Sequence, residues 1–148
     1  MKIKELIIEG FKSYPTRTVL KNFDPQFNAL TGENGTGKSN ILEAIFFVLG
    51  FSLANAKVAR VKDKKDLIYK KGLGQIKEAK VKIIFCNRNK QKSPLGYENV
   101  DELIIERTFS VDCKSKFKIN KVKKTNAQVK EIFKSIRLNV DNYSTFFV

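Results

Sequence analysis

Polar and apolar positions alternate at the start of the chain, as they do in strands with one buried face. Ile3, Leu6 and Ile8 form a short apolar pattern that stops at Gly10. A second run, residues 16–20, follows a turn at Pro15. The pattern predicts an opening β-hairpin.

The spacing of apolar residues then changes from that of a strand to that of a helix. A brief apolar run at 27–30 leads into a glycine-rich turn, after which apolar residues recur at helical spacing until Gly50. These residues are Ile41, Leu42, Ile45, Phe46, Val48 and Leu49. The order predicts a strand, a loop and an amphipathic helix that ends at a glycine.

The middle of the chain alternates between basic and strand-like composition. Residues 54–71 are rich in lysine and predict a basic loop or a short helix. Residues 81–85 and 102–111 then predict two longer strands, with turn composition between them around Pro94. A shorter strand at 116–119 is expected to pair with the second of these.

The pattern returns to helical spacing after Thr125, which is a favourable N-cap residue. The apolar residues that follow fall on one face of a helix, which we expect to pack on the sheet. They are Val129, Ile132, Phe133 and Ile136. The chain then ends in an apolar run at 143–148 without a polar finish, which predicts a fold that continues beyond the last residue.

The composition is that of one folded domain. The 148 residues suffice for one hydrophobic core and are too few for two ordinary domains. Hydrophobic residues make up 42% of the sequence, which excludes a disordered segment. Cys86 and Cys113 lack a CxxC spacing and the chain has no His, so these residues do not predict a metal site.

The charge is strongly basic. Lys and Arg number 29 against 15 acidic residues, which gives a formal net charge of +14. Such an excess favours polyanionic partners, of which nucleic acid is the first candidate. A lysine-rich genome bias would produce the same excess, and the sequence leaves both explanations open.

Residues 32–39 (GENGTGKS) match the pattern G-x-x-x-x-G-K-[ST] of a phosphate-binding P-loop. The match lies between an expected strand and an expected helix, as the motif requires. Its glycines let backbone N–H groups face phosphate oxygens at the positive end of a helix. Lys38 is expected to reach the β and γ phosphates, and the Ser39 hydroxyl is expected to bind Mg²⁺. An ordinary glycine-rich turn with a solvated lysine is the structural alternative.

The P-loop alone does not supply hydrolysis, which also needs an acid that holds the metal and a group that orients water. No apolar strand of the sequence ends in the acidic residue typical of a Walker B segment, and the pair Asp101 and Glu102 precedes its strand. We therefore expect no catalytic residue in this chain and no ATPase activity from the chain alone.

Two segments together resemble the head of an SMC (structural maintenance of chromosomes) ATPase. They are residues 10–14 (GFKSY) and 34–45 (NGTGKSNILEAI). Residues 66–70, 93–98 and 138–140 resemble the condensin branch of that family, and the similarity covers essentially the whole chain.

The resemblance implies an α/β fold on a mixed sheet, that of a P-loop NTPase of the ABC-ATPase head type. Residues 1–148 would form its N-terminal lobe. The C-terminal lobe, with the Walker B acid, would return to it along a coiled coil with a hinge, neither of which is present here. ATP and Mg²⁺ are the implied cofactors, with ATP sandwiched between two engaged heads.

The resemblance also adds candidate site residues. Those predicted to bind ATP are Gly32, Glu33, Asn34, Gly35, Thr36, Gly37, Lys38, Ser39 and Asn40, with Lys12, Ser13 and Asp66 added by the resemblance. Arg60 matches the arginine loop of the family, which senses DNA or contacts the nucleotide. A solvated cation in a lysine-rich loop is the alternative for Arg60.

The implied partners are a second SMC head, a kleisin, other condensin subunits and non-specific duplex DNA. Lys57, Lys62 and Lys64 are expected to help grip the DNA backbone. The implied role is mitotic chromosome condensation in the nucleus and on chromosomes, with cytoplasm between divisions, and without a membrane. A head of a RecF/RecN or double-strand-break repair ATPase, and a passive nucleotide and DNA binding module, are the alternatives.

Overall fold

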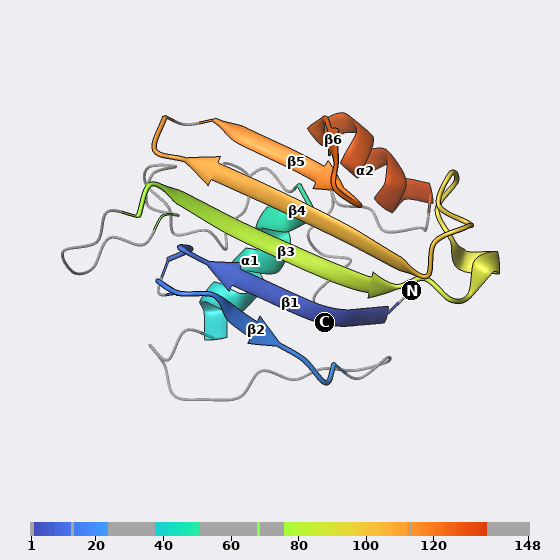
Figure 1. Cartoon of the computed structure of the whole chain (residues 1–148), viewed down its shortest axis with the longest axis horizontal. Coiled ribbons are helices and arrows are strands. Elements are labelled where there is room, and N and C mark those ends of the chain that lie inside the picture. Colours follow the sequence, from blue (N-terminus) through green and yellow to red (C-terminus); the bar gives the residue numbers. More distant parts are fainter. Residues whose placement is uncertain are drawn as a thin grey trace.

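The computed structural model describes residues 2–12, 14–23, 38–50, 68, 76–112 and 114–135. Its centre is a six-stranded sheet in the order β2-β1-β3-β4-β5-β6 (Figure 1). The strands are β1 (Lys2–Glu9), β2 (Thr18–Leu20), β3 (Glu78–Cys86), β4 (Glu102–Ser110), β5 (Ser115–Ile119) and β6 (Val122–Lys124). Every neighbouring pair in this described sheet is antiparallel.

The alternation of side chains in the strands produces one buried face. In β3 every second residue is buried, and Val81 and Ile83 are fully enclosed. The same face of β4 carries Leu103 and Ile105, which are also fully enclosed. Because the two strands pair along their full length, with Ile83 opposite Ile105, their apolar residues form one continuous core.

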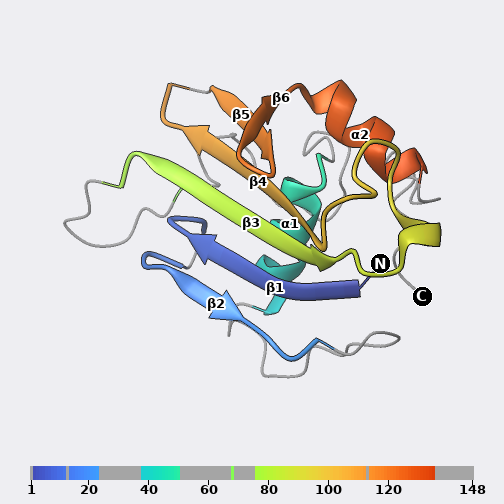
Figure 2. The ribbon, with the colours of Figure 1, turned by 45° about the vertical axis from the view of Figure 1, so that its right-hand side comes forward.

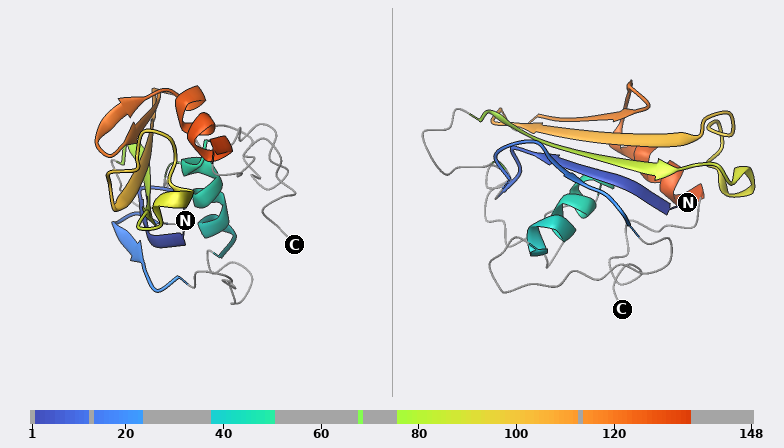
Figure 3. Two further views of the ribbon diagram at one scale, coloured as in Figure 1. Left: turned by 90° about the vertical axis from the view of Figure 1, so that its right-hand side faces the viewer. Right: turned by 60° about the horizontal axis from the view of Figure 1, so that its bottom comes forward.

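Two helices, α1 (Lys38–Val48) and α2 (Asn126–Ser135), cover this buried face. Figure 3 shows both on the same side of the sheet. α1 lies behind β1, β3 and β4, while α2 lies beside β5 and β6 (Figure 2). No described element covers the opposite face, which in β3 carries the half-buried residues Lys80, Lys82, Ile84 and Cys86 (Figure 3).

α1 ends where the sequence predicts. Gly50 has φ +87°, a left-handed conformation that glycine adopts without strain. A Cβ atom at this position would lie 2.6 Å from Oδ1 of Asn126, the first residue of α2. The glycine therefore ends α1 and lets the start of α2 approach it.

The capping prediction for α2 is also confirmed. The backbone N–H of Gln128 donates to Oγ1 of Thr125 at 3.2 Å, and the backbone N–H of Thr125 donates to Oε1 of Gln128 at 2.9 Å. This reciprocal pair is a capping box. Val129 and Phe133 of the predicted apolar face are fully enclosed, and Ile136 lies outside the described residues.

The predicted hairpin of β1 and β2 and the strands β3, β4 and β5 are confirmed, and no predicted strand end differs from the observed one by more than three residues. Two elements were not predicted, namely β6 and the short 3-10 helix η2 (Lys90–Lys92). The predictions at 27–30 and 143–148 lie outside the described residues, as does the prediction at 54–71 apart from residue 68.

The connection between β3 and β4 is held by the enclosed amide of Asn87. Its nitrogen donates to the carbonyls of Tyr97 and Val100, and its oxygen accepts from the hydroxyl of Ser93. Among the described residues, no helix is long and apolar enough to cross a membrane.

Candidate nucleotide-binding site

The predicted phosphate-binding end coincides with the start of α1. Lys38, Ser39 and Asn40 form the first turn of this helix. A first turn exposes backbone N–H groups that have no partner within the helix, and it carries partial positive charge. The first turn of α1 contains no acidic residue that would offset this charge. Its chemistry therefore fits an anionic group such as a phosphate.

The remaining P-loop residues fall outside the part of the chain that the structure describes. These are Gly32, Glu33, Asn34, Gly35, Thr36 and Gly37. Ser13, Arg60 and Asp66 lie outside it as well, as do Lys57, Lys62 and Lys64. Their predicted roles stay predictions.

Lys12 is the one predicted side chain whose contacts the structure describes, and it lies against α1. It follows β1 in a left-handed conformation with φ +49°. Its ammonium group forms an ion pair with the carboxylate of Glu43, in which the Lys12 side chain is 16% exposed and that of Glu43 is 5% exposed. Such a shielded pair fixes both partners, because a lone charge at this depth would be costly.

The ion pair attaches Lys12 to α1 about one helical turn beyond the backbone position of Ser39, the predicted magnesium ligand. Glu43 follows Ser39 by four residues, so the two lie on one face of α1 about one turn apart. The structure thus brings together Lys12 and the helix that begins at Lys38, which lie far apart in the sequence.

Glu43 is a partner of the predicted site residue Lys12 that the sequence prediction missed. It is 4% exposed and sits in a run of buried apolar residues, which are Ala44, Phe46, Phe47, Val48 and Leu49. The signal was present, because a carboxylate inside an otherwise apolar stretch of helix needs a partner. The partner itself, 31 residues earlier, was not visible in the pattern.

Phe11 anchors the Lys12 turn in the core. Its side chain is fully enclosed, and its ring lies 5.3 Å from that of Phe47 in α1. Its backbone forms isolated bridges to Tyr14 and Ile68. Burial of this aromatic ring holds the next residue, Lys12, against the helix.

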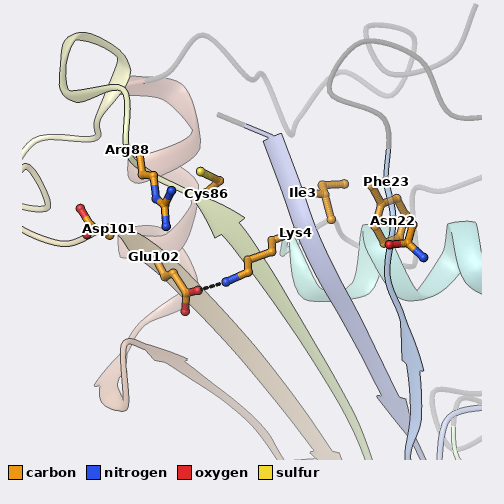
Figure 4. Close-up of a pocket in the computed structure, with 8 residues that line it drawn as sticks. All are labelled: Ile3, Lys4, Asn22, Phe23, Cys86, Arg88, Asp101 and Glu102. Atoms are coloured by element: carbon orange, nitrogen blue, oxygen red, sulfur yellow. Dashed lines mark hydrogen bonds and ion pairs between the residues drawn. The ribbon is translucent and has the colours of Figure 1, made fainter.

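A pocket of about 570 Å³ lies elsewhere, where β1 and β4 begin and β3 ends (Figure 4). It is lined by Ile3, Lys4, Asn22, Phe23, Cys86, Arg88, Asp101 and Glu102. Lys4 and Glu102 form an exposed ion pair there, and this contact raises the pKa of Lys4 above its ordinary value. Lys12, the predicted site residue whose side chain the structure describes, does not line this pocket.

The sequence profile of the RecF/RecN/SMC N terminal domain family matches residues 2–145. The chain belongs to this family. Among its relatives, the structural maintenance of chromosomes protein 2 of Schizosaccharomyces pombe is 48% identical over 142 residues, and that of Homo sapiens is 47% identical over the same length. These matches cover 96% of the chain and only 12% of each relative.

Solved structures of SMC heads share its fold. One, from work on ATP-driven dimerization and DNA stimulated activation of SMC ATPases, superposes with a TM-score of 0.83 at 32% identity, covering 100% of this chain and 85% of the other. The Pyrococcus furiosus Smc head bound to the C-terminal domain of ScpA gives 0.83 at 34% identity, covering 96% and 35%.

The fold class predicted from the sequence is thus confirmed as that of SMC ATPase heads. A RecF structure in complex with ATP gives a TM-score of 0.63 at 21% identity, which shows a common fold alone. The similarity therefore favours SMC heads over the RecF alternative.

Proposed function

We propose that this chain is the ATP-binding N-terminal lobe of an SMC head of the condensin type. The observation that carries the proposal is the start of α1 at Lys38 of the G-K-S sequence, with no acidic residue in its first turn. The identity of 46–48% to structural maintenance of chromosomes protein 2 from several organisms supports the condensin assignment.

Each site residue has a role in this proposal. Backbone N–H groups of residues 32–39 bind the phosphates, Lys38 neutralises their charge, and the Ser39 hydroxyl holds Mg²⁺. Lys12 adds a second cation at the same helix, oriented by Glu43. Bound Mg²⁺ neutralises charge on the phosphate oxygens when ATP is hydrolysed.

Hydrolysis itself requires groups outside this lobe. The proposal includes a C-terminal lobe of the same protein, and a partner SMC head that closes over the nucleotide. The chain spans 12% of the relatives' length, which leaves room for both the second lobe and a coiled coil in proteins of that kind. A kleisin partner is supported by the SMC head solved with the C-winged helix domain of ScpA.

Duplex DNA is the proposed polyanionic partner, with a role in chromosome condensation in the nucleus. The net charge of +14 supports it. The composition of the segment 114–135 supports it as well, because this segment contains eight lysines and a single acidic residue, Glu131. Contacts between lysine side chains and backbone phosphates bind DNA without sequence preference.

Calorimetric titration of the chain with Mg-ATP tests the central claim. We expect saturable binding by the unsubstituted chain and its loss in Lys38→Ala, because the substitution removes the charge that faces the phosphates. Lys77→Ala is the matched control, since Lys77 is an exposed lysine just before β3. Equal binding by Lys38→Ala and Lys77→Ala would contradict the proposed site.

A further inference from the structure

An arginine side chain contacts the C-terminal end of α1, the helix whose first residues belong to the predicted P-loop. Arg107 occupies a core-facing position of β4, between Ile105 and Phe109, which are both buried. A charged residue at such a position needs partners, since burial without them is costly. Among the described residues, no carboxylate forms an ion pair with Arg107.

The partners of Arg107 are a helix end, a hydroxyl and two aromatic rings. Nη1 donates to the backbone carbonyl of Phe47 at 2.8 Å, and Nε donates to Oγ of Ser115 at 2.9 Å. The guanidinium carbon lies 4.4 Å from the ring centroid of Phe47 and 4.8 Å from that of Phe117. One planar group thus joins α1, β4 and β5 through contacts that suit a guanidinium.

The contact with Phe47 is made at the negative end of α1. Phe47 is the second-last residue of the helix, and its carbonyl is one of those that receive no hydrogen bond from the helix itself. It accepts from Arg107 and from the backbone N–H of Gly50. A cation at a helix C-terminus is stabilised by the helix dipole. Burial lowers the pKa of Arg107 to about 10, which still leaves it charged at neutral pH.

The same contact reaches the Lys12 turn. The Phe47 ring, on which Arg107 lies, also packs against the ring of Phe11. Phe11 precedes Lys12, whose ammonium pairs with Glu43 of α1. Arg107 therefore holds both the end of α1 and the aromatic pair that seats Lys12.

We propose that Arg107 is a positioning residue for nucleotide binding, because its hold on the carbonyl and ring of Phe47 fixes α1 along its axis and so places Lys38, Ser39 and Lys12. α1 has 11 residues and is about 16 Å long, so Arg107 acts from a distance through a rigid helix. The inference rests on the proposed function.

The test compares two substitutions of Arg107. Arg107→Met fills the space without a charge, and Arg107→Lys keeps the charge but lacks the planar guanidinium that donates from Nε and Nη1 at once. Phe133→Leu is the matched control, because it also removes core contacts but lies on α2, beside Phe85. Thermal unfolding of each variant sets a temperature at which all are folded, and calorimetry with Mg-ATP then gives the affinity.

We expect Arg107→Met to weaken Mg-ATP binding about tenfold, equivalent to ~1.4 kcal/mol. Arg107→Lys should recover part of the loss, and Phe133→Leu should lower the unfolding temperature while leaving the affinity within about twofold of the unsubstituted chain. Unchanged affinity in folded Arg107→Met, or an equal loss in Phe133→Leu, would overturn the role of Arg107.

A readout without nucleotide separates this inference from the proposed function. In amide NMR spectra, Arg107→Lys should move the resonances of residues 38–40 at the start of α1 and leave those of residues 129–133 in α2 in place. Unmoved resonances at 38–40 would overturn the positioning role even if ATP binds. Absence of ATP binding by the unsubstituted chain, with the resonances moved, would overturn the proposed function and not the mechanical link.

Discussion

The two helices differ most at their N-termini. In α2 the first turn is closed by Thr125 and Gln128, which satisfy each other's backbone N–H groups. α1 begins with Lys38 directly after Gly37, and glycine has no side chain that could cap it. A helix that serves only to cover the sheet closes its own end, whereas in the proposed function the N–H groups at the start of α1 bind phosphate oxygens.

The helices also differ in what they bury. α2 buries one stripe, Val129 and Phe133, with Lys130 and Ile132 half-buried beside it, and exposes its other residues to solvent. α1 buries Glu43 and Ala44 and then Phe46, Phe47 and Val48, so its buried residues include a carboxylate and do not fall on a single stripe. Burial on more than one face makes α1 a fixed axis of the core, which suits a helix whose end must be held in place for a ligand.

The largest expected effect tests the buried charge on α1. Glu43→Leu should lower the free energy of unfolding by about 3 kcal/mol, because it strands the ammonium of Lys12 against an apolar helix. The double variant Lys12→Met/Glu43→Leu should recover most of this loss. Urea denaturation measures the free energies of unfolding of the unsubstituted chain, of Glu43→Leu and of the double variant.

The exposed pair of Lys4 and Glu102 supplies the control for that experiment. Its side chains are 52% and 41% exposed, so Glu102→Gln should cost less than about 1 kcal/mol. A double variant at Lys12 and Glu43 as unstable as Glu43→Leu would show that the carboxylate is needed for more than its partner.

A smaller effect tests the junction between the two helices. Gly50→Ala should lower the free energy of unfolding by about 2 kcal/mol. Alanine is strained in the left-handed conformation of this residue, and its Cβ atom would clash with the side chain of Asn126. Gly96→Ala is the matched control, because Gly96 has φ +92° and a Cβ atom there would meet no other atom within 4 Å. The difference between the two unfolding free energies isolates the contact with α2; equal costs would show that backbone strain alone matters.

The smallest effect tests the cap of α2. Thr125→Ala should cost about 1 kcal/mol, because the N–H of Gln128 loses its acceptor. Thr125→Ser keeps the hydroxyl and serves as the control. Nucleotide binding should be the same in both variants, and a loss of Mg-ATP affinity in Thr125→Ala would remove the distinction drawn between the helices.

The sequence predicted elements whose signals are local. The apolar alternation of β1, β3 and β4, the helical spacing of α1 and the cap at Thr125 each lie within a short window. β6 was missed because two of its three residues are lysine and because the turn before it contains no glycine. Asn120 and Lys121 both have positive φ, at 47° and 71°, in a two-residue turn where the second position usually carries glycine.

The contacts that assemble the candidate site could not be predicted from short windows of sequence, because they join residues that lie far apart in the chain. Lys12 meets Glu43, and Arg107 meets Phe47, only because the sheet brings their elements together. A buried carboxylate and a core-facing arginine can be recognised in a sequence as groups in need of partners. Their partners follow from the order of the strands, which no local pattern contains.

The position of β1 has a consequence for the way the chain acquires its fold. This first strand sits in the interior of the sheet, hydrogen-bonded on one side to β2 and on the other to β3. About 70 residues separate β1 from β3, so at ~5–20 residues per second a ribosome needs several seconds to deliver the second neighbour. During synthesis, the apolar face of Leu6 and Ile8 is thus available to other chains, and non-local pairing of this kind makes folding slow.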